Sequence, residues 1–512
     1  MKNLAFGVLL LFAASAFAAR PIARWDVIPY QRVSGTFKAG VVAFHEKGVK
    51  VQFSVNGKQA FTADNPTLNP RTKVWEYVFA FDASKFDDGL VKLGAKAITD
   101  GEKPYELPEL ELYANSKKTQ GSRKRIWVDP VNGNEFADGS KDSPVKSLKQ
   151  ALAKAGDGGT VFLLPGKYHA KMMGGAKDNR FWTLVCPAKG VKRSQVKILG
   201  GRSGSEKIHF KNVELYSEID SGYGTIMMGE GGATMAWFDN CRFYNKGGRY
   251  GGSVSVFGNR LRAFVTGGST SEVANGPFAE LIRGHSISTI SCDALPPENS
   301  LVVNTTVDGI DATGTAFDPD LFNGFASGKN WAENVILYNI KATDCKAKGI
   351  SGHRMRNCAF VNIVVEGGGG TFADSIFSEE VENCLFAHIT FVDQDLQMMK
   401  TKNRTIDFIP QDVRFFNCVY KNMEGYETSD GSKGLTVRNS AYYNRDEHGK
   451  QVTFGENAVK IERLFPGEAD KNYALPDNSP ARDNGIYLQS IPADINGVPY
   501  PDSTRPCGAY AK

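Results

Sequence analysis

The chain has 512 residues, and its 61 Lys and Arg against 56 Asp and Glu give a formal net charge of +5. This length excludes a single small domain, and the balanced charge, without a charged block, excludes a strong nucleic-acid-binding surface. Apolar residues make up 41% of the chain and glycine is abundant, so we expect a folded, turn-rich protein.

The first residues have the features of a secretory signal. Lys2 precedes an apolar run at 4–12, and the small residues of 16–18 stand just before Arg20. We therefore predict a signal peptide at 1–19 and a secreted protein, extracellular or periplasmic. No later apolar segment has the length that a membrane-spanning helix needs, so we expect no membrane span. We also expect a monomer.

Short strands are predicted in the next hundred residues. Apolar and polar residues alternate over runs at 41–44, 49–55, 74–82 and 89–98. The pair Asn56-Gly57 after the second run is a strong signal for a hairpin. We predict a small β-sandwich of the immunoglobulin-like type over 20–118, followed by a polar linker at 119–125.

A degenerate repeat fills the rest of the chain. Seven segments share an Asn, a small or apolar residue after it, a large apolar residue at +3, and Asn, His or Ser at +5. The repeat asparagines are Asn212, Asn240, Asn334, Asn357, Asn383, Asn417 and Asn439. The last five are separated by 23, 26, 34 and 22 residues, which is typical of the coils of a parallel β-helix.

The repeat predicts stacked columns of side chains. We expect Asn357, Asn383 and Asn417 to stack along one edge, because equivalent positions of neighbouring coils lie about 4.8 Å apart. The cysteine that follows each of them would then point inward. We expect free packed thiols, and disulfides between adjacent coils remain an alternative.

The segment 126–169 resembles the N-terminal module of secreted right-handed parallel β-helix proteins of the pectate-lyase-like superfamily. Its apolar residues at 145–155 fall on one face of a helix that would cap the open first coil. The segments 479–485, 494–499 and 507–510 resemble the closing segments of such proteins. The resemblance implies an all-β fold: a right-handed parallel β-helix at 126–512 with an N-terminal capping helix, preceded by the β-sandwich.

An acidic stretch suggests a metal site. Four carboxylates lie in one predicted coil: Asp308, Asp311, Asp318 and Asp320. Carboxylates at this density suit Ca²⁺, and in lyases of the fold it resembles, this ion neutralises a uronate carboxylate. Turn-forming aspartates are the alternative. The stretch also resembles, with one inserted residue, the NTDG-x-D signature of polygalacturonases, although the further motifs of those hydrolases are absent.

Equal offsets from the repeat asparagines place possible catalytic groups beside these carboxylates. Counted from Asn304, Asp318 lies at +14 and Asp320 at +16; counted from Asn334, Lys348 lies at +14. His353 and Arg354 follow further along. A Lys or Arg base beside a cation-bound carboxylate is what β-elimination needs. A surface ion pair is the alternative.

A basic stretch at 240–271 suggests a place for an anionic polysaccharide. Cations would contact carboxylates while aromatic rings pack on sugars. The candidate binding residues are Arg242, Arg249, Tyr250, Arg260 and Arg262. A solvated turn face is the alternative.

Together these patterns predict a secreted, polysaccharide-active protein. We favour a lyase that cleaves uronate-containing polysaccharide by β-elimination, with Ca²⁺ as a possible cofactor. A glycoside hydrolase of the polygalacturonase type and a non-catalytic glycan-binding or surface protein are the alternatives. The fold it resembles is shared by enzymes and adhesins, so it leaves open whether the protein is catalytic.

Overall fold

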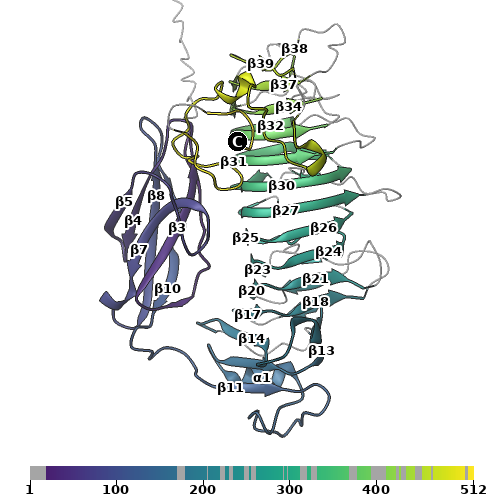
Figure 1. The fold of residues 1–512 in the computed structure, drawn as a ribbon. Helices are drawn as coiled ribbons and strands as arrows, with labels where there is room; N and C mark the ends of the chain where they lie inside the picture. The colour runs from purple at the N-terminus through teal and green to yellow at the C-terminus, as the bar shows by residue number, and fades with distance from the viewer. Residues whose placement is uncertain are drawn as a thin grey trace, which may run out of the picture.

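A computed structural model describes most of the chain (Figure 1). The described residues are 19–169, 179–203, 206–218, 225–229, 234–246, 253–254, 261–291, 293–296, 298–311, 320–323, 331–346, 348–367, 377–393, 411–422, 426–427, 434–443, 452–462, 465–501 and 505–511. The predicted signal peptide lies outside them except for its last residue. Among the described residues, no helix has the length and apolarity needed to cross a membrane.

The N-terminal part is a β-sandwich of two sheets whose strands are antiparallel except for one short parallel pair. One sheet orders its strands as β1 (Ile22–Trp25), β3 (Thr36–Phe44), β7 (Trp75–Asp82) and β6 (Thr67–Leu68). The other contains β2 (Arg32–Val33), β10 (Leu110–Ala114), β8 (Gly89–Ile98), β4 (Lys50–Val55), β5 (Lys58–Ala63) and β9 (Tyr105–Glu106).

The inward side chains of the two sandwich sheets pack into common cores, for example Val41 of β3 against Val51 of β4. Asn56 and Gly57 both have positive φ and join β4 to β5, which confirms the predicted hairpin. The immunoglobulin-like subtype stays a prediction.

The rest of the chain is a parallel β-helix, as predicted. Its stacked strands are β11 (Arg125–Val128), β12 (Thr160–Leu163), β13 (Gly166–His169), β14 (Thr183–Pro187), β15 (Val196–Leu199), β17 (Ile208–Lys211), β18 (Glu214–Ser217), β20 (Thr234–Asp239), β21 (Arg242–Asn245), β23 (Leu261–Thr266), β24 (Ser269–Val273), β25 (Leu281–Arg283), β26 (Ser286–Ile290), β27 (Leu301–Asp311), β28 (Asp320–Asn323), β29 (Ala332–Glu333), β30 (Ile336–Lys346), β31 (Lys348–Glu366), β32 (Phe377–Val392), β33 (Gln411–Phe416), β34 (Val419–Lys421), β36 (Leu435–Arg438), β37 (Ala441–Tyr443) and β39 (Val459–Lys460). Shorter sheets contain β16 (Gly201–Ser203), β19 (Thr225–Gly229) and β22 (Ser253–Val254), and β35 (Tyr426–Glu427) with β38 (Val452–Thr453).

Helix α1 (Leu148–Ala155) caps the first coil. Ser147 and Gln150 form a reciprocal capping box at its start, and Gly156 ends it with φ of 68°. Its apolar face, including Leu148 and Leu152, joins the core of the β-helix. This confirms the predicted capping helix.

Three corners of the coils hold residues in the left-handed backbone conformation, and parallel register aligns each corner into a column. The first corner is formed by Asn299, Asn334, Asn357, Asn383 and Asp412. The second corner is formed by Asn212, Asn240, Gly267, Gly284, Asn304, Asn339, Asn362, His388, Asn417, Asn439 and Asn457. The third corner is formed by Glu272, Thr289, Gly309, Asp344, Gly367, Asp393 and Asn422.

The predicted single column is therefore wrong in one respect. Asn383 donates to Asn357 at 3.0 Å in the first corner, as expected, but Asn417 stacks on His388 in the second corner, at 3.0 Å. Neighbouring corners are five residues apart in the chain, so the pattern "Asn, then Asn or His at +5" fits both of them. The first-corner residue in the coil of Asn417 is Asp412.

The cysteines divide in the same way. Cys358 and Cys384 are partners in adjacent strands behind the first corner, whereas Cys418 lies behind the second. All three are buried, as predicted. The seven described cysteines are free thiols.

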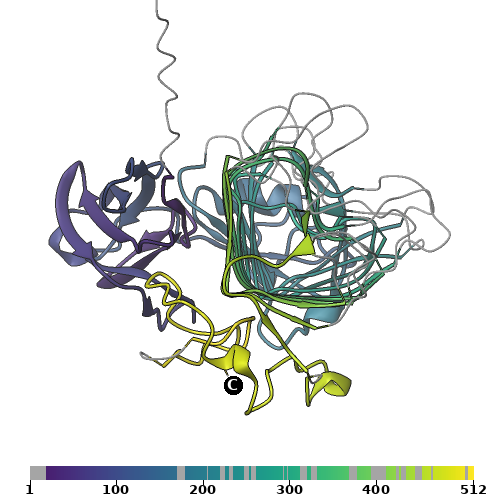
Figure 2. The same cartoon turned by 90° about the horizontal axis from the view of Figure 1, so that it is seen from above.

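One wall of the β-helix, between the first and second corners, is covered by the β-sandwich; we call it the sandwich wall. Figures 1 and 2 show the sandwich lying along the stack, with the C-terminal segment beside it. The shared apolar core contains, among others, Val42 and Phe44 of the sandwich, Tyr338 and Leu385 of the β-helix, and Leu488 of the C-terminal segment. At its centre this wall is therefore closed to a large ligand.

Candidate functional site

The structure brings Asp320 and Lys348 to neighbouring positions. Asp320 begins β28, Lys348 begins β31, and the two residues are partners in the parallel register. Their backbones therefore lie about one strand spacing, ~4.8 Å, apart. The carboxylate of Asp320 is buried at 1% exposure. Lys348 is placed by its backbone alone.

The coil before Asp320 contributes another carboxylate. Leu295 pairs with Phe322, which puts Asp293 in register with Asp320. The amide of Asn323 donates to Asp293 at 3.4 Å. The sequence analysis missed Asp293, although the steps from Asp293 to Asp320 and on to Lys348, 27 and 28 residues, are each close to one coil.

Arg354 and His353 lie on the same strand as Lys348 but further along it. Six residues of strand span up to about 20 Å, so Arg354 is not a direct neighbour of Lys348. Arg354 is half-buried, and its register partner in β32 is Glu380. The strand register therefore places a basic position beside an acidic one here as well.

Two other predicted metal ligands, Asp308 and Asp311, belong to strand β27. Asp308 of β27 accepts a hydrogen bond from Thr343 at 2.8 Å and pairs with Lys471 at 3.4 Å. Asp311 pairs with Lys346 at 3.4 Å. Asp318 lies outside the described residues. Within the described part of the chain, no three His, Cys, Asp or Glu side chains group together, and a calcium site stays a prediction.

Two of the five candidate binding residues of the basic stretch are described, and they lie on different walls. Arg242 lies past the second corner, with its guanidinium 4.7 Å from the ring centre of Tyr244 and 3.9 Å from Glu214. Arg262 lies on the sandwich wall and binds Glu280 through two contacts of 2.5 and 2.9 Å. The structure does not bring them together. Arg249, Tyr250 and Arg260 fall outside the described residues.

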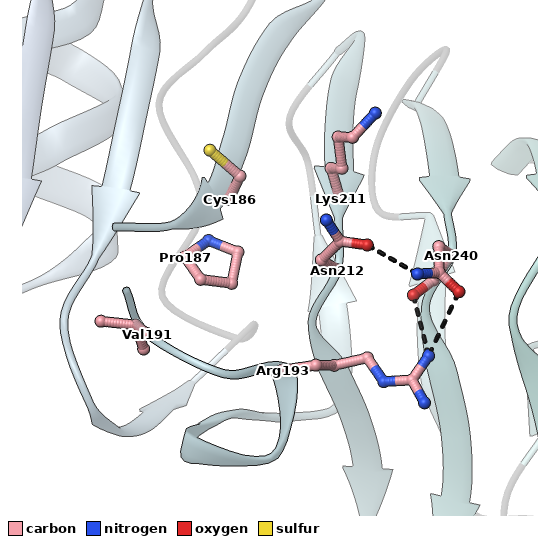
Figure 3. A pocket seen from close by; sticks show the side chains of 7 residues that line it. All are labelled: Cys186, Pro187, Val191, Arg193, Lys211, Asn212 and Asn240. Carbon is pink, nitrogen blue, oxygen red and sulfur yellow. Dashed lines mark hydrogen bonds between the residues drawn. The ribbon is translucent and has the colours of Figure 1, made fainter. Parts of the chain in front are cut away.

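An open pocket of about 550 Å³ lies at the second corner of the lower coils (Figure 3). Its lining residues are Cys186, Pro187, Val191, Arg193, Lys211, Asn212 and Asn240. Sequence reasoning missed this pocket, because its residues come from strands of three coils and from the short turn η3 (Arg193–Gln195).

Polar contacts order the pocket. Arg193 donates to the backbone and side-chain oxygens of Asn240 at 3.2 and 3.3 Å, and Asn240 donates to Asn212 at 2.7 Å. Lys211 binds Asp239 at 2.8 Å. Burial opposes ionisation of Asp239, but the hydrogen bond from Lys211 and the His209 ring 3.6 Å away outweigh it and lower the pKa of Asp239 to about 2.

Comparison with known proteins shows no matching family model and no matching curated protein. Several solved structures are similar to this chain, and three of them are the following. A GH136 lacto-N-biosidase from Eubacterium ramulus is 11% identical with a TM-score of 0.38, over 66% of this chain and 68% of that chain. XylC in complex with xylose is 9% identical with a TM-score of 0.41, over 76% and 98%. A rhamnogalacturonan lyase is 12% identical with a TM-score of 0.29, over 74% and 96%. At these values the likenesses carry no argument for an activity.

Proposed function

We propose that this protein is exported and acts on an anionic, uronate-containing polysaccharide as a lyase. The observation that supports the proposal is the register of Asp320 with Lys348 on adjacent coils. A buried carboxylate and a lysine position one strand apart fit a site that must hold a cation and a base together.

The proposed chemistry is β-elimination. Lys348 removes the C5 proton of a uronate, the electron pair forms a C4–C5 double bond, and the bond from C4 to the leaving glycosidic oxygen breaks. That oxygen then takes up a proton. Arg354, further along the same strand, would contact a carboxylate of the polymer.

Calcium fits the donors of this column. The side chains of Asp293, Asp320 and Asn323 carry the oxygen atoms that Ca²⁺ prefers. When bound, the ion would neutralise the uronate carboxylate and so make the C5 proton more acidic. Asp320 is the residue of the predicted calcium ligands that lies in this column.

A panel of uronate polysaccharides tests the proposal. The ultraviolet absorbance of the unsaturated product should rise with at least one polymer, and a chelator should abolish the rise until Ca²⁺ is restored. New reducing ends without that absorbance would indicate a hydrolase instead. Binding without either product would indicate a glycan-binding protein.

A further inference from the structure

Two aromatic rings lie in the coils below the pocket residue Cys186. In the parallel register Trp127 pairs with Phe162, and Phe162 pairs with Cys186. The same register puts Lys211 of the next coil beside Cys186. The rings of Trp127 and Phe162 are half-buried, with their centres 4.9 Å apart. An apolar ring surface therefore borders the polar pocket, about one coil spacing from Cys186.

The column of asparagine amides ends at this pocket. Further up, Asn339 donates to Asn304 at 2.9 Å and Asn362 donates to Asn339 at 3.1 Å, so each amide nitrogen points to the coil below. Asn212 accepts from Asn240 in the same way. The position below Asn212 is Pro187, whose side chain has no acceptor. Figure 3 shows the amide nitrogen of Asn212 on the side of Pro187 and its oxygen on the side of Asn240.

The pocket therefore presents mainly hydrogen-bond donors. Among the described residues, the Arg193 guanidinium contacts oxygens of Asn240 and no carboxylate. Lys211 shares its charge with Asp239, and its side chain is 46% exposed. Donors and cations on one side and aromatic rings on the other match a ligand that has a carboxylate and an apolar ring face.

We propose that this pocket binds an acidic sugar residue of a polysaccharide. Arg193 and Asn212 hold the carboxylate, and Trp127 with Phe162 packs against the adjoining sugar ring. The choice of ligand rests on the proposed function, but the site is separate from the Asp320 column. Four coil spacings, roughly 20 Å, separate Asn212 from Asn304 of the Asp320 coil along the axis.

Binding of trigalacturonate, measured by calorimetry at low salt, tests the site. Arg193→Ala should weaken binding about tenfold or more, because a charge-assisted hydrogen bond to the carboxylate is lost. Asn212→Gly, which keeps the left-handed backbone, should weaken it as well. Arg438→Ala removes a half-exposed arginine at the far end of the stack and should leave affinity unchanged. Equal affinity of Arg193→Ala and the unaltered protein would overturn the proposal.

Cys186 provides a readout that needs no substitution. It is the one described cysteine that is not buried, and it lines the pocket. Trigalacturonate should slow its alkylation by iodoacetamide, followed by peptide mapping, whereas the neutral galactose trisaccharide should not. Unchanged alkylation of Cys186 at saturating trigalacturonate would also overturn the proposal.

The proposed lyase activity and this site can fail separately. Trigalacturonate protection of Cys186 in a protein that cleaves no polymer would support the pocket and contradict the lyase. Cleavage that is lost in Lys348→Ala, together with unprotected Cys186, would support the lyase and contradict the pocket.

Discussion

The amide nitrogen of Asn362 donates to Oδ1 of Asn339 in the coil below, at 3.1 Å, and to the backbone oxygen of Ala493 at 2.7 Å. Asn362 is fully buried and has φ of 51°. One side chain thus links two coils to the C-terminal segment, while its backbone adopts a conformation that asparagine tolerates better than most residues.

Asn362→Gly should lower the free energy of unfolding by about 2 kcal/mol, since three hydrogen bonds are lost, including one that Asn362 accepts from the Tyr500 hydroxyl at 3.4 Å. Asn362→Ala should cost roughly 1 kcal/mol more, because alanine is strained at positive φ. Urea unfolding of the two variants measures both effects. Equal stability of the two variants would contradict the role given to the backbone.

Glu76 should make stability depend on pH. Its side chain is buried and accepts hydrogen bonds from Asn69 and Thr72; burial first, and then the nearby charge of Asp26, raises the pKa of Glu76 well above 4.5. A carboxyl whose pKa is raised by folding binds its proton more tightly in the folded state. The contribution of Glu76 to the free energy of unfolding is therefore complete at acid pH, and it is lost as the pH rises through the raised pKa.

Glu76→Gln should flatten this loss, because the amide stays neutral at every pH. Unfolding free energies measured from about pH 5 to about pH 9 should fall more for the unaltered protein than for Glu76→Gln. The exposed Glu106→Gln serves as the control and should leave the slope unchanged. A slope shared by all three proteins would assign the pH dependence to other groups.

Lys348→Ala should abolish elimination, because the proposed base is lost, while the protein stays folded. Lys341→Ala, on the neighbouring strand β30, is the matched control and should keep its activity. Product absorbance and the urea midpoint measure the two effects. Full activity of Lys348→Ala would end the role given to this residue.

Arg414 should be important for docking the sandwich. It is 4% exposed, lies on the sandwich wall, and binds Glu46 of the sandwich and Asp412 of its own strand. Arg414→Met should lower the free energy of unfolding by about 2 kcal/mol, because it leaves two partly buried carboxylates without their cation. Arg438→Met breaks a surface pair with Glu456, 2.9 Å apart, and should cost under about 1 kcal/mol in the same urea assay.

The sequence predicted the fold well where local rules decide it. The Asn56-Gly57 hairpin needs positive φ at two positions, and the amphipathic face of α1 needs a core to cover, so both follow from neighbouring residues. The corner assignment of Asn417 failed because the same five-residue spacing recurs on both sides of a corner.

The candidate column was predicted with an error of two residues. Equal offsets aligned Asp318 with Lys348, whereas the strand register aligns Asp320 with it. Counting residues from a corner aligns two coils only as far as their strands are paired. The hydrogen bonds between strands do not fix the number of residues between one strand and the next. Strand β27 ends at Asp311 and strand β28 begins at Asp320, so the count from Asn304 to Asp320 runs beyond one strand. The pocket around Arg193 was missed since its residues converge only when three coils stack.

The second corner contains two glycines, Gly267 and Gly284, between Asn240 and Asn304. Glycine has no side-chain amide, so the column of hydrogen bonds between side chains is interrupted over these two coils. In a stack where each coil contacts only its neighbours, the contact between neighbouring coils is weaker at such an interruption. The two halves of the stack would therefore unfold separately most easily there. The sandwich bridges it, because its apolar core reaches from Trp182 below the gap to Phe416 above it. We therefore expect the N-terminal domain to make the two halves of the stack unfold together.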